Sequence, residues 1–170
     1  AELGWTGIAI PEEHGGLGLG FSHLVPIVES MGRQLMPSPL IWSSISAHTL
    51  SLSDNEVLKS NWLPKLVSGA IGTMALMEPG GSWDLNATTC RASIDGDRLK
   101  LSGSKVFVED ANIADFIIVV VTLDSKPQLV LLEASAINTN GLQRETVIDE
   151  TRRSFRLELD GIQVPVSNLL

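Results

Sequence analysis

The stretch Ala92-Ser93-Ile94-Asp95-Gly96-Asp97-Arg98-Leu99-Lys100-Leu101 decides the architecture of the larger part of the chain. Asp95-Gly96 has the turn chemistry of a tight hairpin, because glycine readily adopts the positive φ angles that such turns require. On the C-terminal side, Leu99 and Leu101 alternate with polar residues, which is the period of a half-buried strand. The sequence therefore predicts a β-hairpin here.

The same texture extends outward from this hairpin over residues 70–170. The apolar run from Phe116 to Thr122 predicts a central strand buried on both faces, and Phe155, Leu157 and Leu159 alternate like a half-buried strand. About eight strands at close spacing favour a small antiparallel barrel or sandwich. We expect a β domain over residues 70–170.

The first 69 residues have the pattern of a partial helical bundle. We expect Ser22 to cap a first helix that ends at Pro37 and Pro39, and a second helix from Leu40 to Leu50. A third helix is expected to start at a cap near Ser53 or Asp54 and to end around the Leu63-Pro64 break. The core stripe of the first helix comprises Leu24, Ile27, Val28, Met31 and Leu35. The fold class is therefore α+β.

A glycine-rich segment precedes the first helix. Gly15, Gly16, Gly18 and Gly20 place four glycines within six positions. They follow no strand-to-helix pattern of a phosphate-binding loop, so they predict turns in which the backbone passes close to a neighbour.

Composition excludes several functional classes. The chain is 44% hydrophobic and 19% charged, with a net charge of −8 and dispersed basic residues, which argues against nucleic acid as a partner. The longest apolar run, Phe116 to Val121, is too short to cross a bilayer. One cysteine and three scattered histidines offer neither an internal disulfide nor a metal site. We expect a cytoplasmic protein without metal or membrane insertion.

The chain begins without methionine and ends on Asn168-Leu169-Leu170, so it reads as an interior piece of a longer sequence. It contains no G-x-S-x-G elbow, phosphate loop or dinucleotide fingerprint. Composition and periodicity alone name no reaction.

Five separated motifs go further, because their order and spacing resemble those of the acyl-CoA dehydrogenase family. They cover almost the whole chain and are ELGW leading to PEEHGGLG (2–5 and 11–18), WLPKLVSG (62–69), ALMEPGGS (75–82), GSKVFV with AD (103–108 and 114–115), and LDGIQVP (159–165).

The resemblance implies a partial N-terminal helical domain over residues 1–69 and a middle β-barrel of two near-orthogonal sheets over residues 70–170. It also implies FAD as cofactor and an acyl-CoA thioester as substrate. A carboxylate base removes the α-proton while the β-hydrogen leaves as hydride to flavin N5, which gives a trans-enoyl thioester. The family's base lies in a C-terminal helical domain that this sequence does not include, so no catalytic residue is assigned here.

The first loop that the resemblance places against the flavin contains Leu76, Met77, Gly81 and Ser82. Met77 stands where the family has a threonine, and a thioether donates no hydrogen bond, so only its main-chain amide is left to serve the flavin. Ser82 is expected to contact a phosphate or the substrate's pantetheine arm; the alternative is an ordinary turn serine.

The second flavin-facing loop contains Phe107, Val108 and Glu109. Phe107 is expected to supply a flat apolar wall, although a core phenylalanine has the same sequence pattern. Glu109 replaces a threonine or serine hydroxyl with a carboxylate, which would repel reduced flavin. The alternative is that Glu109 points to solvent while Asp110 makes the turn.

Arg152 or Arg153 is a candidate to pair with a CoA phosphate, and Arg153 is the predicted substrate-binding residue; the alternative is that both are ordinary surface charges.

The resemblance to the family implies an electron-transfer partner and a homo- or hetero-oligomer. Two other readings stay open: a partner subunit whose own flavin site has decayed, and an acyl-CoA oxidase or flavin monooxygenase of the same superfamily.

Overall fold

The computed structural model describes residues 2–138 and 140–170. The chain divides into two compact units, Ala1–Gly72 and Thr73–Leu170. The first is helical and the second is built of strands, so the predicted α+β class is confirmed. None of the described helices has the length and apolar character that crossing a bilayer requires.

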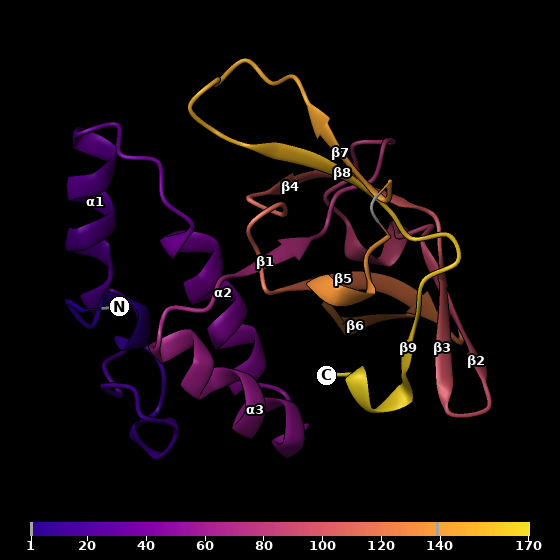
Figure 1. Ribbon diagram of the computed structural model, residues 1–170, viewed down its shortest axis with the longest axis horizontal. Helices are drawn as coiled ribbons and strands as arrows, with labels where there is room; N and C mark the ends of the chain where they lie inside the picture. The colour runs from indigo at the N-terminus through magenta and orange to yellow at the C-terminus, as the bar shows by residue number, and fades with distance from the viewer. Residues whose placement is uncertain (1, 139) are drawn as a thin grey trace. The chain divides into compact units, whose positions relative to one another are not determined.

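Three helices form the first unit, and Figure 1 shows them in the indigo and violet part of the chain. Their bounds are α1 Val25–Arg33, α2 Leu40–Ser51 and α3 Glu56–Val67. Short 3₁₀ turns precede α1. The core beneath α1 is an apolar cluster of Ile8, Leu24, Met31 and Leu40, with Trp5, Ala9, Ile27 and Val28 packed against it.

The N-cap predicted at Ser22 is wrong. Ser22 lies in the 3₁₀ turn Phe21–His23, which runs directly into α1, so Leu24 already has helical φ and ψ angles and no side chain caps the helix. A residue whose side chain caps a helix has extended φ and ψ angles, and the residue before the first turn of α1, Leu24, does not.

The end of α1 also differs from the prediction. The helix stops at Arg33, before Pro37, because Leu35 adopts a left-handed φ of 49°. The amides of Met36 and Leu35 then bond to the carbonyls of Met31 and Gly32, the pattern of a Schellman cap. Leu35 is consequently 82% exposed and does not belong to the core stripe.

The third helix starts one residue later than expected and continues through its proline. The Asn55 side chain caps α3 by accepting the Leu58 amide at 3.1 Å. Pro64 lies in the last part of α3, where it removes a single amide from the helix, and the Ser68 amide still reaches the Pro64 carbonyl. Leu63 and Leu66, both buried, anchor this turn in the core.

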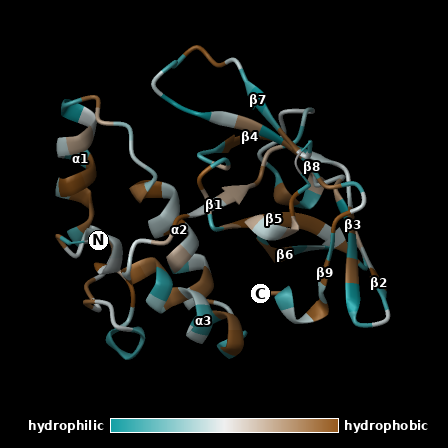
Figure 2. Ribbon diagram, viewed as in Figure 1, coloured by the Kyte–Doolittle hydropathy of each residue, from teal (hydrophilic) through white to brown (hydrophobic). Residues whose placement is uncertain are grey.

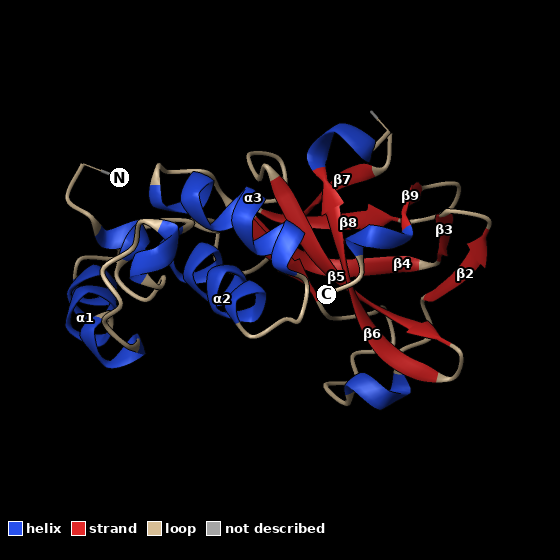
Figure 3. Cartoon of the chain, turned by 90° about the horizontal axis from the view of Figure 1, so that it is seen from below, coloured by secondary structure: helices blue, strands red, loops and turns tan. Residues whose placement is uncertain are grey.

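Within the described residues, nine strands build the second unit, the first of them starting at the boundary residue Gly72, where about eight were expected. They are β1 Gly72–Ala75, β2 Arg91–Asp95, β3 Arg98–Ser102, β4 Ser104–Glu109, β5 Phe116–Leu123, β6 Lys126–Glu133, β7 Leu142–Glu145, β8 Ser154–Glu158 and β9 Gln163–Pro165. One sheet has the order β1-β5-β2-β3-β9 with β6 also paired to β5, and the other has the order β4-β8-β7 (Figure 3).

The predicted hairpin and the predicted central strand are both confirmed. The hairpin pairs Asp95 with Arg98, and Gly96 has a φ of 62°. Every residue of β5 except Thr122 is buried, and this is the apolar strand at the centre of the larger sheet in Figure 2. The pairing of β2 with β5 is parallel, at Arg91 and Thr122, unlike the antiparallel β2-β3, β3-β9, β5-β6, β4-β8 and β7-β8 pairs.

Gly16 fits the expectation of close backbone approach. A Cβ atom at this residue would lie 2.0 Å from the Ile10 carbonyl oxygen, whereas a Cβ at Gly20 would meet nothing within 4 Å. The two glycines of one loop therefore differ sharply in the space around them.

Gly16→Ala is expected to lower the free energy of unfolding by at least about 2 kcal/mol, because the backbone of residues 10–16 must shift to admit the methyl group. Gly20→Ala, the matched control, should stay within about 0.5 kcal/mol of the original chain. Urea denaturation measures both values. Equal stabilities for the two variants would contradict the packing described at Gly16.

Candidate functional site

A buried ion pair lies beneath the first of the two predicted ligand-facing loops. Lys105, on β4, has a side chain with no exposed surface, and its Nζ donates to Glu78 Oε1 at 2.9 Å and to the Leu76 carbonyl at 3.2 Å. A buried ammonium is tolerated only when its charge is paired and its donors are used. The pair therefore joins the segment that follows β1 to strand β4.

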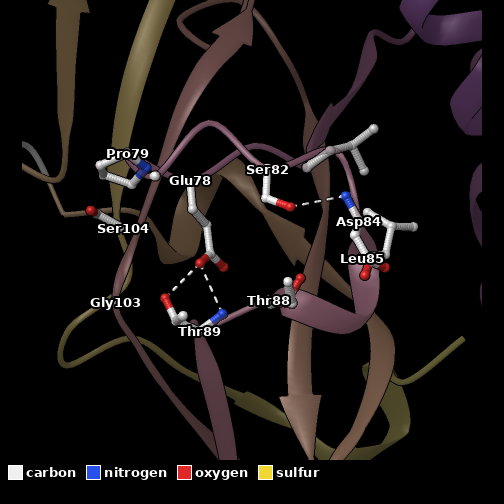
Figure 4. A pocket seen from close by; sticks show the side chains of 12 residues that line it. Glu78, Pro79, Ser82, Asp84, Leu85, Thr88, Thr89, Gly103 and Ser104 are labelled. Carbon is white, nitrogen blue, oxygen red and sulfur yellow. Dashed lines mark hydrogen bonds between the residues drawn. The ribbon is translucent and has the colours of Figure 1, made fainter.

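Glu78 also holds the far end of the same loop. Its carboxylate accepts the Thr89 amide at 2.8 Å, the Thr89 hydroxyl and the Cys90 amide at 3.0 Å. Figure 4 shows the two bonds to Thr89. Burial alone would raise the pKa of Glu78, but the hydrogen bonds from Lys105, Thr89 and Cys90 outweigh it and lower the pKa to about 2. One carboxylate thus fixes both ends of the loop between β1 and β2.

Local turns shape the loop between these anchors. Gly81 has a φ of 73° and its amide bonds to the Glu78 carbonyl at 2.8 Å. The Ser82 hydroxyl accepts the Asp84 amide at 3.1 Å, as drawn in Figure 4, and Asp84 caps the short turn that follows by accepting the Asn86 amide. Ser82 is therefore a turn serine by its acceptor role, and its hydroxyl proton is still available to a ligand.

A groove of about 460 Å³ opens along this loop. Leu76, Ser82 and Leu85 line it together with Gly103 and Ser104 at the start of β4. Its size lies in the range of small-molecule sites, and it combines apolar walls with hydroxyl groups. Of the four residues expected in the first loop, Leu76 and Ser82 line this groove, whereas Met77 and Gly81 are not among the residues that line it.

Met77 contributes its backbone rather than its side chain to the loop. Its carbonyl accepts the Val106 amide at 2.9 Å, which joins the loop to β4. Among the hydrogen bonds of residues 2–138 and 140–170, none uses the Met77 amide. A donor is thus present at this position even though the thioether cannot supply one.

The second predicted loop is the far end of β4, where the strand pairing shifts register between Lys105 and Val108. Phe107 has a φ of 56° and is 52% exposed, and its amide donates to Glu145 Oε2 at 2.8 Å. Such irregularities re-aim side chains at strand edges. Phe107 is an exposed aromatic surface, so the alternative of a core phenylalanine is wrong.

Val108 corrects one expectation for this loop. Its relative exposure is 0%, because the register shift turns it into the core while Phe107 turns outward. Its side chain therefore supports the wall from within and offers no surface to a ligand.

Glu109 does not point freely into solvent. Its Oε2 accepts Arg152 Nη1 at 2.7 Å, and its carbonyl accepts the Thr73 hydroxyl at 2.7 Å. Asp110 has a φ of 54° and makes the turn, as that same alternative expected. The carboxylate that the sequence places at this loop is thus already neutralised by an arginine.

The structure separates the two adjacent arginines that the sequence leaves equivalent. Arg152 forms the ion pair with Glu109, whereas Arg153 is exposed and its carbonyl accepts the Asp110 amide at 2.8 Å. The sequence reasoning also missed Lys105, Glu78 and Glu145 as anchors of the two loops. Glu78 lies in the motif ALMEPGGS and Lys105 in the motif GSKVFV. The tertiary structure is needed to show which partners Glu78, Lys105 and Glu145 contact.

Glu78 predicts a specific acid response. Its pKa is about 2 in the folded chain and 4.5 when unperturbed, so its contribution to stability is present above pH 4.5 and is lost as the pH falls toward 2. Glu78→Gln should be less stable at neutral pH, since Lys105 loses its charge partner, and its stability should fall less between these pH values. Urea denaturation over this pH range measures both effects.

Glu29→Gln is the control, because Glu29 pairs with Arg33 on the exposed surface of α1. It should keep the acid sensitivity of the original chain. An unchanged pH profile in Glu78→Gln would show that Glu78 is not the titrating anchor.

Cys90 provides a second check of the same region. Its Sγ is buried and donates to the Ser104 carbonyl at 3.4 Å, and burial, reinforced by Glu78, raises the pKa of its thiol to about 12. At about pH 8 the folded chain should react with a chromogenic disulfide reagent only as fast as it opens, and urea-unfolded chain should react at once. Rapid labelling of the folded chain would contradict this packing.

The comparisons with known proteins agree with this architecture. The family model described as acyl-CoA dehydrogenase, N-terminal domain, matches residues 1–70. A probable acyl-CoA dehydrogenase of Bacillus subtilis, YngJ, is 32% identical over 180 aligned positions that include 99% of the chain. The chain spans 47% of that protein's length, so it corresponds to about half of this relative.

Solved structures match over nearly the whole chain. A putative acyl-CoA dehydrogenase from Mycobacterium smegmatis has a TM-score of 0.84 and 25% identity, over 99% of this chain and 47% of its own. The ChsE4-ChsE5 complex from Mycobacterium tuberculosis also gives a TM-score of 0.84, with 26% identity over 99% of this chain and 45% of the matched chain. With the helical unit, the two-sheet unit and the two anchored loops, these similarities show that the chain belongs to the acyl-CoA dehydrogenase superfamily.

Proposed function

We propose that this chain is the half of an FAD-dependent acyl-CoA dehydrogenase that binds the flavin and part of the thioester. The observation that carries the proposal is Phe107, an aromatic side chain held half-exposed by the irregularity in β4 and by the Glu145 carboxylate. A flat apolar surface maintained in water at the cost of a left-handed φ is suited to stack on a planar ring.

The residues of this chain fit a flavin on three counts. Phe107 offers a stacking face, the Met77 amide offers a donor, and the Arg152 guanidinium removes the net charge of Glu109. Ser82 and Leu76 line the groove along the neighbouring loop, where a phosphate or a pantetheine arm would meet a hydroxyl and an apolar wall. The methionine at residue 77 therefore leaves a main-chain donor in place, and the charge of Glu109, where the family has threonine or serine, is paired with Arg152.

The roles proposed for this chain are binding and orientation. Bound flavin supplies the chemistry by accepting a hydride from the β-carbon of the thioester. The two anchored loops would hold its ring and phosphates in place, and such positioning is a large part of catalysis when two groups must act on opposite faces of one substrate. Arg153, exposed beside this end of β4, stays a candidate for a CoA phosphate.

No residue of this chain is proposed as the base that removes the α-proton. The chain by itself is therefore proposed to be inactive, and the whole enzyme to be a cytoplasmic oligomer that passes electrons to a separate protein.

A second candidate is a partner subunit that binds no flavin of its own. The two departures at Met77 and Glu109 favour it, and the similar M. tuberculosis structure is described as a complex of two proteins, ChsE4 and ChsE5. The donor at Met77 and the ion pair at Glu109 rank it below the flavin-binding function.

FAD binding tests the proposal directly. The purified chain mixed with FAD and desalted should retain a flavin absorption band, and Phe107→Ala should weaken FAD binding by at least about tenfold, since stacking contributes about 1 to 3 kcal/mol. Ile94→Ala removes another half-exposed apolar side chain, in β2, which pairs with β3 in the other sheet, and should bind FAD like the original chain. With acyl-CoA and an artificial electron acceptor, no reduction is expected.

Retention of no flavin by the original chain would favour the partner-subunit function. Equal FAD affinity in the Phe107 and Ile94 variants would place the flavin elsewhere. Reduction of the acceptor would show that the chain carries its own base.

A further inference from the structure

Phe107 and Glu109, at the end of β4, are both held by one neighbouring segment. Glu145, the last residue of β7, accepts the Phe107 amide at 2.8 Å, and Arg152, in the turn before β8, donates to Glu109 at 2.7 Å. Both also line a polar groove of about 490 Å³. The β7-β8 hairpin thus reaches the end of β4 with one carboxylate and one guanidinium.

The turn holds Arg152 from the other side as well. The Arg152 amide donates to the Asp149 carbonyl at 3.1 Å, and its Nε lies 3.9 Å from Asp149 Oδ2. Asp149 is itself fixed by Thr151, whose amide donates to Oδ1 at 3.0 Å. The guanidinium is therefore held toward Glu109 by its own turn and is not a freely moving surface side chain.

The Arg152–Glu109 pair is partly buried, so the attraction between its charges is stronger than in a fully exposed pair. The Arg152 and Glu109 side chains are 37% and 27% exposed, so water screens their charges only in part. A carboxylate accepts hydrogen bonds and donates none, whereas a guanidinium has five donors and stays charged at any ordinary pH. The pair therefore cancels the charge of Glu109 and brings guanidinium donors to this end of β4.

We propose that Arg152 is a positioning residue of the flavin site, which neutralises Glu109 and so allows the electron-rich ring to lie against Phe107. This inference rests on the proposed function and adds a residue to it. Residue 109 lacks the hydroxyl that the family has there. Arg152 compensates by cancelling the charge of Glu109, and not by donating the hydrogen bond that the hydroxyl would donate.

The test compares FAD dissociation constants by equilibrium dialysis for the full chain and its variants, with circular dichroism to check folding. Arg152→Ala leaves Glu109 uncompensated and should bind FAD at least about tenfold more weakly. The double variant Glu109→Thr with Arg152→Ala removes both charges and should return to within about threefold of the original chain. Arg152→Lys keeps the charge and should also bind within about threefold.

Arg33→Ala is the matched control, because it breaks an arginine–glutamate pair of similar length, 2.6 Å to Glu29, in the helical unit. It should not change FAD binding. A purely structural role for Arg152 predicts that the double variant binds as poorly as Arg152→Ala, and that result would overturn the inference.

Equal binding by Arg152→Ala and the original chain would overturn the inference while leaving the proposed function in place. If Arg152→Ala does not fold, the Lys variant decides: binding within about threefold supports the inference and a larger loss overturns it. Failure of the original chain to bind FAD is a different outcome, visible before any variant is made, and it would overturn the proposed function together with this inference.

Discussion

The buried pair between Lys105 and Glu78 is the interaction on which the rest of the candidate site depends. It fixes the two ends of the loop between β1 and β2 and joins that loop to β4, the strand that carries Phe107 and Glu109 at its other end. A buried ammonium and carboxylate are costly to desolvate, so such a pair is a means of fixing geometry more than of adding stability. Here the fixed geometry is that of two loops on one strand.

The carboxylates at the other end of β4 are also held by specific partners. Glu109 and Glu145 would together place two carboxylates beside an exposed aromatic ring, but each is engaged, the first by Arg152 and the second by the Phe107 amide and the Ser154 hydroxyl. Asp110, next in the chain, has its pKa raised, chiefly by burial and then by Glu109, while Arg153 and Arg152 oppose the rise. Of the two carboxylates beside Phe107, Glu109 is therefore paired with an arginine, whereas Glu145 keeps its charge and is held by neutral hydrogen-bond donors.

Local sequence predicted the elements whose cause is local. The Asp95-Gly96 turn and the apolar run of β5 need no distant partner to be recognised, because a positive-φ turn and an unbroken β-branched stretch each restrict the backbone directly. Predictions failed where a local rule competed with its surroundings. Ser22 does not cap α1, because a 3₁₀ turn runs directly into the helix. Leu35 is outside the apolar stripe because its left-handed φ closes the Schellman cap, and Pro64 lies within α3 instead of ending it.

The sequence by itself determined the α+β class, the order of helices before strands and, through its motifs, the family and the two loops to inspect. Only the tertiary structure decided which side chains in those loops are available. Val108 and Phe107 are neighbours in sequence, yet a register shift buries one and exposes the other; Arg152 and Arg153 are identical in type, yet only the first meets Glu109. Pairing partners 43 residues apart depend on strand register and turn geometry, which composition and periodicity do not encode.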